Sequence, residues 1–111
     1  MDIPLTPNNA AAYFERGYSL TIMKRYEDAI SALDVAIKLY PEFPIAYHYK
    51  GISLAALNRN EEAIAAYDVM IKLSPNNPQT YIEKASVLRR IGRDKEADIC
   101  LEKVRELKSV S

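Results

Sequence analysis

The chain has little of what most catalytic, secreted or membrane proteins need. Its 111 residues include one cysteine, one histidine, three glycines and no tryptophan. The single cysteine, Cys100, excludes an internal disulfide and favours a reducing compartment, which we expect to be the cytoplasm. Fifteen basic and fifteen acidic side chains cancel, so the chain lacks the positive field typical of proteins that bind nucleic acid or anionic membranes.

Motifs that carry chemistry are also missing. No apolar run is long enough for a membrane helix or a secretory signal. The chain contains no glycine-rich phosphate loop, no Cys-x-x-Cys pair and no constellation of carboxylates. The one histidine, His48, has no second ligand or carboxylate partner, so we expect it to pack or form a hydrogen bond. We therefore predict that the protein is not an enzyme and holds no metal or cofactor.

What the chain does contain is a period of 34 residues. Proline, tyrosine, alanine, small residues and leucine each recur at this step in three copies. A fixed period of this length predicts tandem structural repeats. The recurring positions are Pro7, Pro41 and Pro75; Tyr13, Tyr47 and Tyr81; Gly17, Gly51 and Ala85; Leu20, Leu54 and Leu88; and Ala29, Ala63 and Ala97.

Each repeat is expected to hold two helices, because proline and glycine fall mainly at the joints between apolar, helix-periodic stretches. In the first repeat, the pattern predicts helices over Asn9–Met23 and Tyr26–Tyr40. At the joint before the third repeat, Asn77 is the expected N-cap and Pro78 the first helical residue. The turns between the two helices of a repeat are expected to centre on Lys24, Asn58 and Gly92, of which asparagine and glycine favour a left-handed backbone.

These slots of tyrosine, glycine, leucine, alanine and proline resemble the tetratricopeptide repeat, a helix-turn-helix unit of 34 residues. The resemblance covers nearly the whole chain. It implies an all-α fold, a right-handed solenoid of three repeats and about six antiparallel helices without a separate capping helix. The expected units are a leader over residues 1–9 that resembles a repeat joint, followed by repeats over 10–43, 44–77 and 78–111.

Small residues in each first helix have a physical reason. Gly17, Gly51 and Ala85 lie on the face that carries the recurrent tyrosines, where only a small residue lets the two helices of a repeat approach closely. The family usually has a leucine just before this position. The three repeats of this chain hold Arg16, Lys50 and Lys84 there instead. We expect the stems of these long side chains to cover apolar surface.

Beside this core face, each first helix carries a second stripe about a quarter turn away. The resemblance implies that this stripe lines a concave groove that binds peptides. The same spacing is also typical of residues that pack against a neighbouring repeat, and Ile45 and Ile82 are the members that fit this alternative best. The candidate peptide-binding residues are Phe14, Tyr18, Ile22, Ile45, His48, Tyr49, Ile52, Ile82, Glu83 and Arg89.

Some members of the resembling family grip an acidic carboxyl terminus of chaperones through lysine, asparagine and arginine side chains. The matching positions of this chain carry no cation that could clamp a terminal carboxylate. The resemblance therefore implies an apolar or amphipathic peptide segment as the ligand, docked by hydrophobic anchors. The five matching positions hold Phe14, Tyr18, Tyr49, Gln79 and Glu83.

A self-associating assembly module is the alternative function. A stacked array leaves an apolar face at each end, and such a face can join two copies. On this interpretation, apolar residues of the third repeat are expected to stay partly uncovered: Val87, Ile91, Cys100 and Val104. Against it, the last helix is more polar than its equivalents, as expected of a terminal repeat, because isoleucine and valine positions hold Asp98, Lys103 and Arg105.

Overall fold

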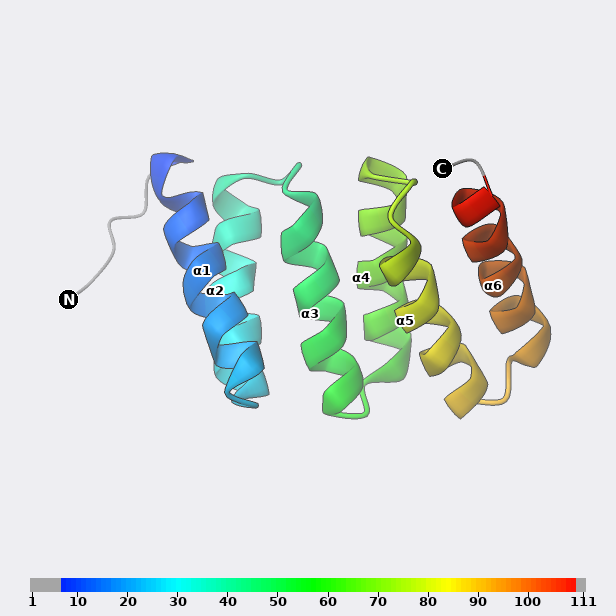
Figure 1. Ribbon diagram of the computed structural model, residues 1–111. Coiled ribbons are helices and arrows are strands. Elements are labelled where there is room, and N and C mark those ends of the chain that lie inside the picture. Colours follow the sequence, from blue (N-terminus) through cyan, green and yellow to red (C-terminus); the bar gives the residue numbers. More distant parts are fainter. Residues whose placement is uncertain (1–6, 110–111) are drawn as a thin grey trace.

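The computed structural model describes residues 7–109, which form six α-helices after a short 3-10 turn, η1 (Pro7–Asn9). The helices form three antiparallel pairs that stand in a row, and no strand occurs within residues 7–109 (Figure 1). The expected all-α solenoid is therefore confirmed. In chain order the helices are α1 (Ala10–Ile22), α2 (Tyr26–Leu39), α3 (Pro44–Ala56), α4 (Asn60–Leu73), α5 (Pro78–Arg90) and α6 (Asp94–Ser109).

The ends of the helices follow the signals in the sequence. The helix expected over Asn9–Met23 is longer than α1 by one residue at each end, and that expected over Tyr26–Tyr40 is longer than α2 by one residue at its C-terminal end. Asn77 is the N-cap of α5, where its Oδ1 accepts a hydrogen bond from the backbone N–H of Gln79 at 3.1 Å. Pro78 begins α5, where its missing N–H leaves no helical hydrogen bond unmade.

All three turns within repeats use a left-handed backbone. The angle φ is 63° at Lys24, 61° at Asn58 and 81° at Gly92. In the first turn, the backbone N–H of Arg25 donates to the carbonyl of Leu20 at 2.9 Å, and the other two turns repeat this bond. The hydrogen bond closes the C-terminal turn of the helix and holds even lysine in a conformation that it disfavours.

Two glycines allow the helices of the first two repeats to touch. A Cβ atom at Gly17 would lie 2.5 Å from Cγ of Leu33, and one at Gly51 would lie 2.4 Å from Cε1 of Tyr67. Both facing side chains are fully buried, with 0% exposure. The expected close approach of the paired helices is therefore confirmed at these positions.

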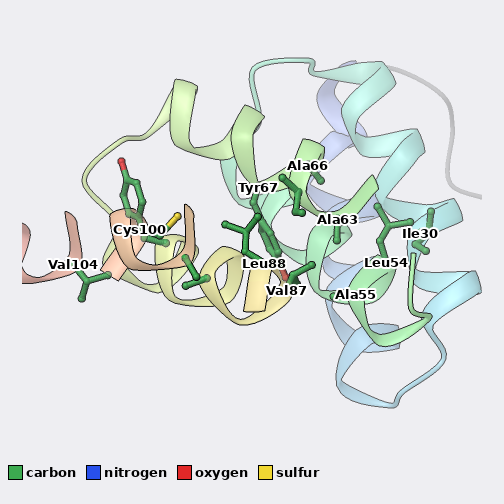
Figure 2. Packing of buried hydrophobic residues seen from close by; sticks show 14 residues of the cluster. Ile30, Leu54, Ala55, Ala63, Ala66, Tyr67, Val87, Leu88, Cys100 and Val104 are labelled. Carbon is green, nitrogen blue, oxygen red and sulfur yellow. The ribbon is translucent and has the colours of Figure 1, made fainter. Parts of the chain in front are cut away.

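The core is one continuous cluster that runs along the row of helices from Ile30 to Val104 (Figure 2). The expectation that the apolar residues of the third repeat stay partly uncovered is wrong for three of the four residues. Val87, Cys100 and Val104 keep only 2%, 6% and 7% exposure, because they belong to this cluster, and Ile91 packs against it half-buried. The exposed apolar side chain of α6 is instead Ile99, with 70% exposure.

Hydrogen bonds between tyrosine and proline explain why these two residues recur together. The hydroxyl of Tyr47 donates to the carbonyl of Pro41 at 2.9 Å, and that of Tyr81 donates to the carbonyl of Pro75 at 2.7 Å. In each case the first helix of a repeat is tied to the joint that precedes it. The bonds satisfy carbonyl groups that have no partner in regular structure.

Ion pairs join neighbouring repeats on the α2–α3 and α4–α5 boundaries. The Nζ atom of Lys50 lies 2.7 Å from Oδ1 of Asp34, and Nζ of Lys84 lies 2.6 Å from Oδ1 of Asp68. The two lysine side chains keep 29% and 21% exposure, so much of each stem is covered. Their ammonium groups add a contact between repeats that the sequence pattern does not predict.

The row of helices has an inner and an outer side. Helix α3 contacts both α1 and α5, whereas α2, α4 and α6 make no contact with one another within the described residues. First helices therefore lie closer together than second helices, and the array curves toward them. We call the surface formed by α1, α3 and α5 the inner surface.

Candidate functional site

Five aromatic rings gather on the inner surface where the first two repeats meet. Phe14 and Tyr18 come from α1, Tyr49 comes from α3, and Tyr40 and Phe43 come from the joint between α2 and α3. We call this group the aromatic cluster. It brings together side chains that are up to 35 positions apart in the chain, from Phe14 to Tyr49.

The rings of the aromatic cluster touch in a chain of edge-to-face and tilted contacts. The centroids of Tyr18 and Tyr49 lie 4.8 Å apart with their planes at 87°. Phe14 lies between several partners, at 5.1 Å from Phe43, 6.0 Å from Tyr49 and 6.2 Å from Tyr18. Tyr40 extends the group, at 5.6 Å from Phe43. These distances suit the attractive contacts of aromatic pairs, so the rings hold one another in place.

The aromatic cluster is open to solvent on part of its surface. Tyr18 is 40% exposed and Tyr40 is 49% exposed, while Phe14, Phe43 and Tyr49 are half-buried. Burial raises the pKa of Tyr49, and the nearby hydroxyl of Tyr18 raises it further. Partly covered, mutually supported aromatic rings are typical of surfaces that bind another protein.

Two members of the aromatic cluster, Tyr40 and Phe43, were not predicted as site residues. Both lie in a joint, outside the helical stripe on which the prediction was based. A signal was nevertheless present, because the equivalent positions in the next joint hold Ser74 and Asn77. Two aromatic residues in place of the polar residues of a regular joint indicate a local role beyond the repeat itself.

The third repeat supplies the charged end of the predicted stripe. Glu83 is half-buried on α5, and its Oε1 accepts a hydrogen bond from Nε2 of Gln79 at 2.9 Å. Arg89 is exposed and turns toward α6, where Nη2 lies 3.0 Å from Oδ1 of Asp98. The acidic side chain, rather than the basic one, therefore belongs to the inner surface of this repeat.

The predicted isoleucines have different surroundings. Ile22, at the end of α1, is 62% exposed. Ile45 is half-buried at the start of α3. Ile52 and Ile82 are also half-buried and pack against the hydrophobic core cluster. Their placement divides the predicted stripe into residues that a partner can reach and residues that support the repeat boundary.

His48 lies inside the boundary between the second and third repeats. It keeps 5% exposure, and its Nδ1 is 3.0 Å from Oγ1 of Thr80. Burial lowers the pKa of His48, and the charge of Glu83 opposes this shift. The neutral imidazole therefore takes part in a buried hydrogen bond between α3 and α5, as the sequence led us to expect of a packing histidine.

No metal site or reactive thiol emerges from the described part of the chain. Within residues 7–109, no group of three histidine, cysteine or acidic side chains is placed to hold a metal ion. Burial raises the pKa of the Cys100 thiol, so it is protonated at neutral pH. None of the helices over residues 7–109 combines the length and apolar character required to cross a membrane.

Comparison with known families identifies the fold. Profiles described as tetratricopeptide repeat match residues 2–42, 23–78 and 78–110. The chain belongs to the tetratricopeptide repeat family. The resemblance found in the recurrent slots is thereby confirmed, and the repeats together with the likeness to MamA support a scaffold for protein–protein interaction or assembly.

Solved structures of MamA share this tetratricopeptide arrangement. A crystal structure of MamA is 26% identical, covers 90% of this chain and 58% of its own, and superposes with a TM-score of 0.87. The MamA fragment 41-end from Desulfovibrio magneticus RS-1 is 24% identical, covers 95% of this chain and 59% of its own, and has a TM-score of 0.89. The tetratricopeptide chain thus spans just under three fifths of the length of these MamA chains. No curated protein sequence matches it.

Proposed function

We propose that the inner surface binds an apolar or amphipathic segment of a partner protein, with the aromatic cluster as its main contact. The observation that supports this most strongly is the group of five rings that pack against one another while Tyr18 and Tyr40 remain open to solvent. Because these rings are already held in place, they lose little conformational entropy on binding. More of the free energy gained by burying them therefore contributes to affinity. Aromatic anchors of this kind dominate the binding energy of many interfaces.

The charges of the inner surface argue against an acidic chain terminus as the ligand. The positions at which related repeats place a cationic clamp hold Phe14, Tyr18, Tyr49, Gln79 and Glu83. A carboxylate at this surface would meet aromatic rings and a like charge, and it would lose its water without gaining a charge-assisted hydrogen bond. Hydrophobic anchors are the contacts that this surface can satisfy.

A peptide-display selection tests this proposal. Random dodecapeptides are selected on the wild-type protein, and the enriched peptides are measured by fluorescence anisotropy against a Phe14→Ala, Tyr49→Ala double variant. We expect the double variant to lose at least tenfold in affinity while circular dichroism shows unchanged helix content. The control is Tyr26→Ala, which removes an aromatic ring outside the aromatic cluster and should bind normally. Equal binding by the double variant would move the site elsewhere and contradict the proposal.

A self-associating assembly module is the second candidate, and one observation favours it. Ile99 is 70% exposed beside a hollow of about 640 Å³ on α6 that Leu101 and Val104 also line. Contact between two copies would cover this apolar surface. Light scattering over a wide concentration range tests it: growth in molar mass that Ile99→Asp abolishes would support assembly, and a constant monomer mass would exclude it.

The proposed role is a binding role throughout. It requires no catalysis, cofactor or metal, and it involves neither nucleic acid nor a membrane. The zero net charge of the sequence and its single, buried cysteine support action on a protein partner in the reducing cytoplasm. Fluorescence microscopy of a tagged full-length protein tests the location, and a membrane-bound or extracellular signal would contradict it.

A further inference from the structure

Glu83 differs from every other acidic residue that the structure describes. Within residues 7–109, all other aspartate and glutamate side chains are exposed, whereas Glu83 is half-buried. A carboxylate that has lost part of its water needs compensating donors or a positive charge. Glu83 lies on the inner surface, so the compensating donor or positive charge is needed at the site proposed for the partner segment.

The protein itself does not supply that charge. Among the described residues, no lysine, arginine or histidine forms an ion pair with Glu83, and its one hydrogen-bond donor is the side-chain amide of Gln79. Two cations of α5 are engaged elsewhere, because Lys84 pairs with Asp68 and Arg89 pairs with Asp98. The third, Arg90, is exposed at the end of α5 and forms no ion pair with Glu83.

Two buried groups on which the charge of Glu83 acts are neutral. Burial lowers the pKa of His48, so the imidazole does not provide a stable positive charge at neutral pH. Tyr67 is fully buried, and its hydroxyl has no hydrogen-bond partner among the described residues. The charge of Glu83 acts on both groups: it raises the pKa of Tyr67 beyond the effect of burial, while the charge of Arg90 lowers it. Glu83 is therefore a half-buried carboxylate of the inner surface that has no ion-pair partner among the described residues.

An aromatic ring stands at the equivalent position of the neighbouring helix. Tyr49 and Glu83 are 34 residues apart, so they occupy the same slot of α3 and α5. The ring of Tyr49 also lies 5.3 Å from that of His48, whose pKa the charge of Glu83 raises against the effect of burial. A cation that approaches the carboxylate over this surface can also interact with the face of an aromatic ring.

We propose that Glu83 binds a lysine or arginine side chain of the partner segment, and that the segment is therefore basic as well as apolar. This inference rests on the proposed function of the inner surface and specifies its ligand. Apolar side chains of the segment cover the aromatic cluster, and the basic side chain donates to the Glu83 carboxylate. The half-buried carboxylate has already lost part of its water on folding. The charge-assisted hydrogen bond from the partner replaces the water that remains.

The selected dodecapeptides provide the test, with one isosteric variant and one matched control. Glu83→Gln removes the charge but keeps the shape and can keep the contact with Gln79. Glu15→Gln removes the same charge from the equivalent slot of α1, where the carboxylate is exposed. We expect peptides selected on the wild-type protein to be enriched in lysine or arginine beside apolar residues. Glu83→Gln should weaken their binding about tenfold, and Glu15→Gln should change it less than twofold.

A second arm varies the peptide. In the tightest binder, replacing its basic residue by glutamine should lower affinity for the wild type about tenfold and for Glu83→Gln hardly at all. Binders without basic residues, or equal losses for Glu15→Gln and Glu83→Gln, would overturn the inference while leaving an apolar groove intact. If the Phe14→Ala, Tyr49→Ala variant binds the peptides normally, the proposed function itself fails and this inference fails with it.

Discussion

Replacing Gly51 by leucine should destabilise the protein strongly without altering its inner surface. A Cβ atom at this position would lie 2.4 Å from Cε1 of Tyr67, well inside the usual separation of about 3.5–4.0 Å between carbon atoms. The ring of Tyr67 is fully buried, so it can retreat only by displacing its neighbours. Overpacking a close-packed core costs about 1–3 kcal/mol, and four added carbon atoms place this change at the upper end.

One favourable effect offsets part of that cost. A glycine within a helix is less stable than an ordinary residue by up to about 1 kcal/mol, so leucine improves the intrinsic stability of α3. The net loss in the free energy of unfolding should be about 2 kcal/mol. For a chain of this size, this corresponds to a fall in melting temperature of about 8 °C.

Urea denaturation followed by circular dichroism measures this loss. The control is Ala56→Leu on the same helix, where the side chain is exposed and the free energy of unfolding should change by less than about 0.5 kcal/mol. Combining Gly51→Leu with Tyr67→Ala should give less than the sum of the two losses, because the missing ring leaves space for the leucine. An unchanged unfolding midpoint for Gly51→Leu, or strict additivity with Tyr67→Ala, would refute the packing argument.

Two further predictions concern single side chains. Tyr81→Phe should lower the free energy of unfolding by about 1 kcal/mol, because the carbonyl of Pro75 loses its hydrogen bond; no change in thermal denaturation would contradict the proposed tie between joint and helix. Burial lowers the pKa of His48, so the unfolded chain binds a proton more readily than the folded chain. Stability should therefore fall as pH decreases below about 6.5, by at most about 1.4 kcal/mol per pH unit. His48→Gln should have a flatter profile between pH 5 and 6.5, and an identical slope would argue against a buried neutral imidazole.

The local parts of the fold could be predicted because the signals lie close together in the sequence. Asn77 and Pro78 start α5 by chemistry that involves only their own turn, and the glycine slots follow from the spacing of one helical face. The 34-residue period supplied the remaining evidence, since three copies of each slot exclude an accidental pattern.

Contacts between repeats were harder to predict, since they depend on the angle at which one helix pair packs on the next. The ion pair of Lys50 with Asp34 spans a repeat boundary, so no helical period relates the two residues. The burial of His48 against Thr80 has the same origin. Tyr40 and Phe43 join the aromatic cluster because the joint turns them toward α1, and a helical stripe cannot show this.

The central claim is that a partner segment binds on the inner surface over the aromatic cluster. Amide chemical-shift mapping of the isotope-labelled protein with the tightest selected dodecapeptide tests it most directly. The account predicts perturbations that centre on Tyr18, Tyr49 and Glu83 and leave the exposed faces of α2 and α4 unchanged. Perturbations confined to those outer helices, or to the hollow beside Ile99 on α6, would contradict it.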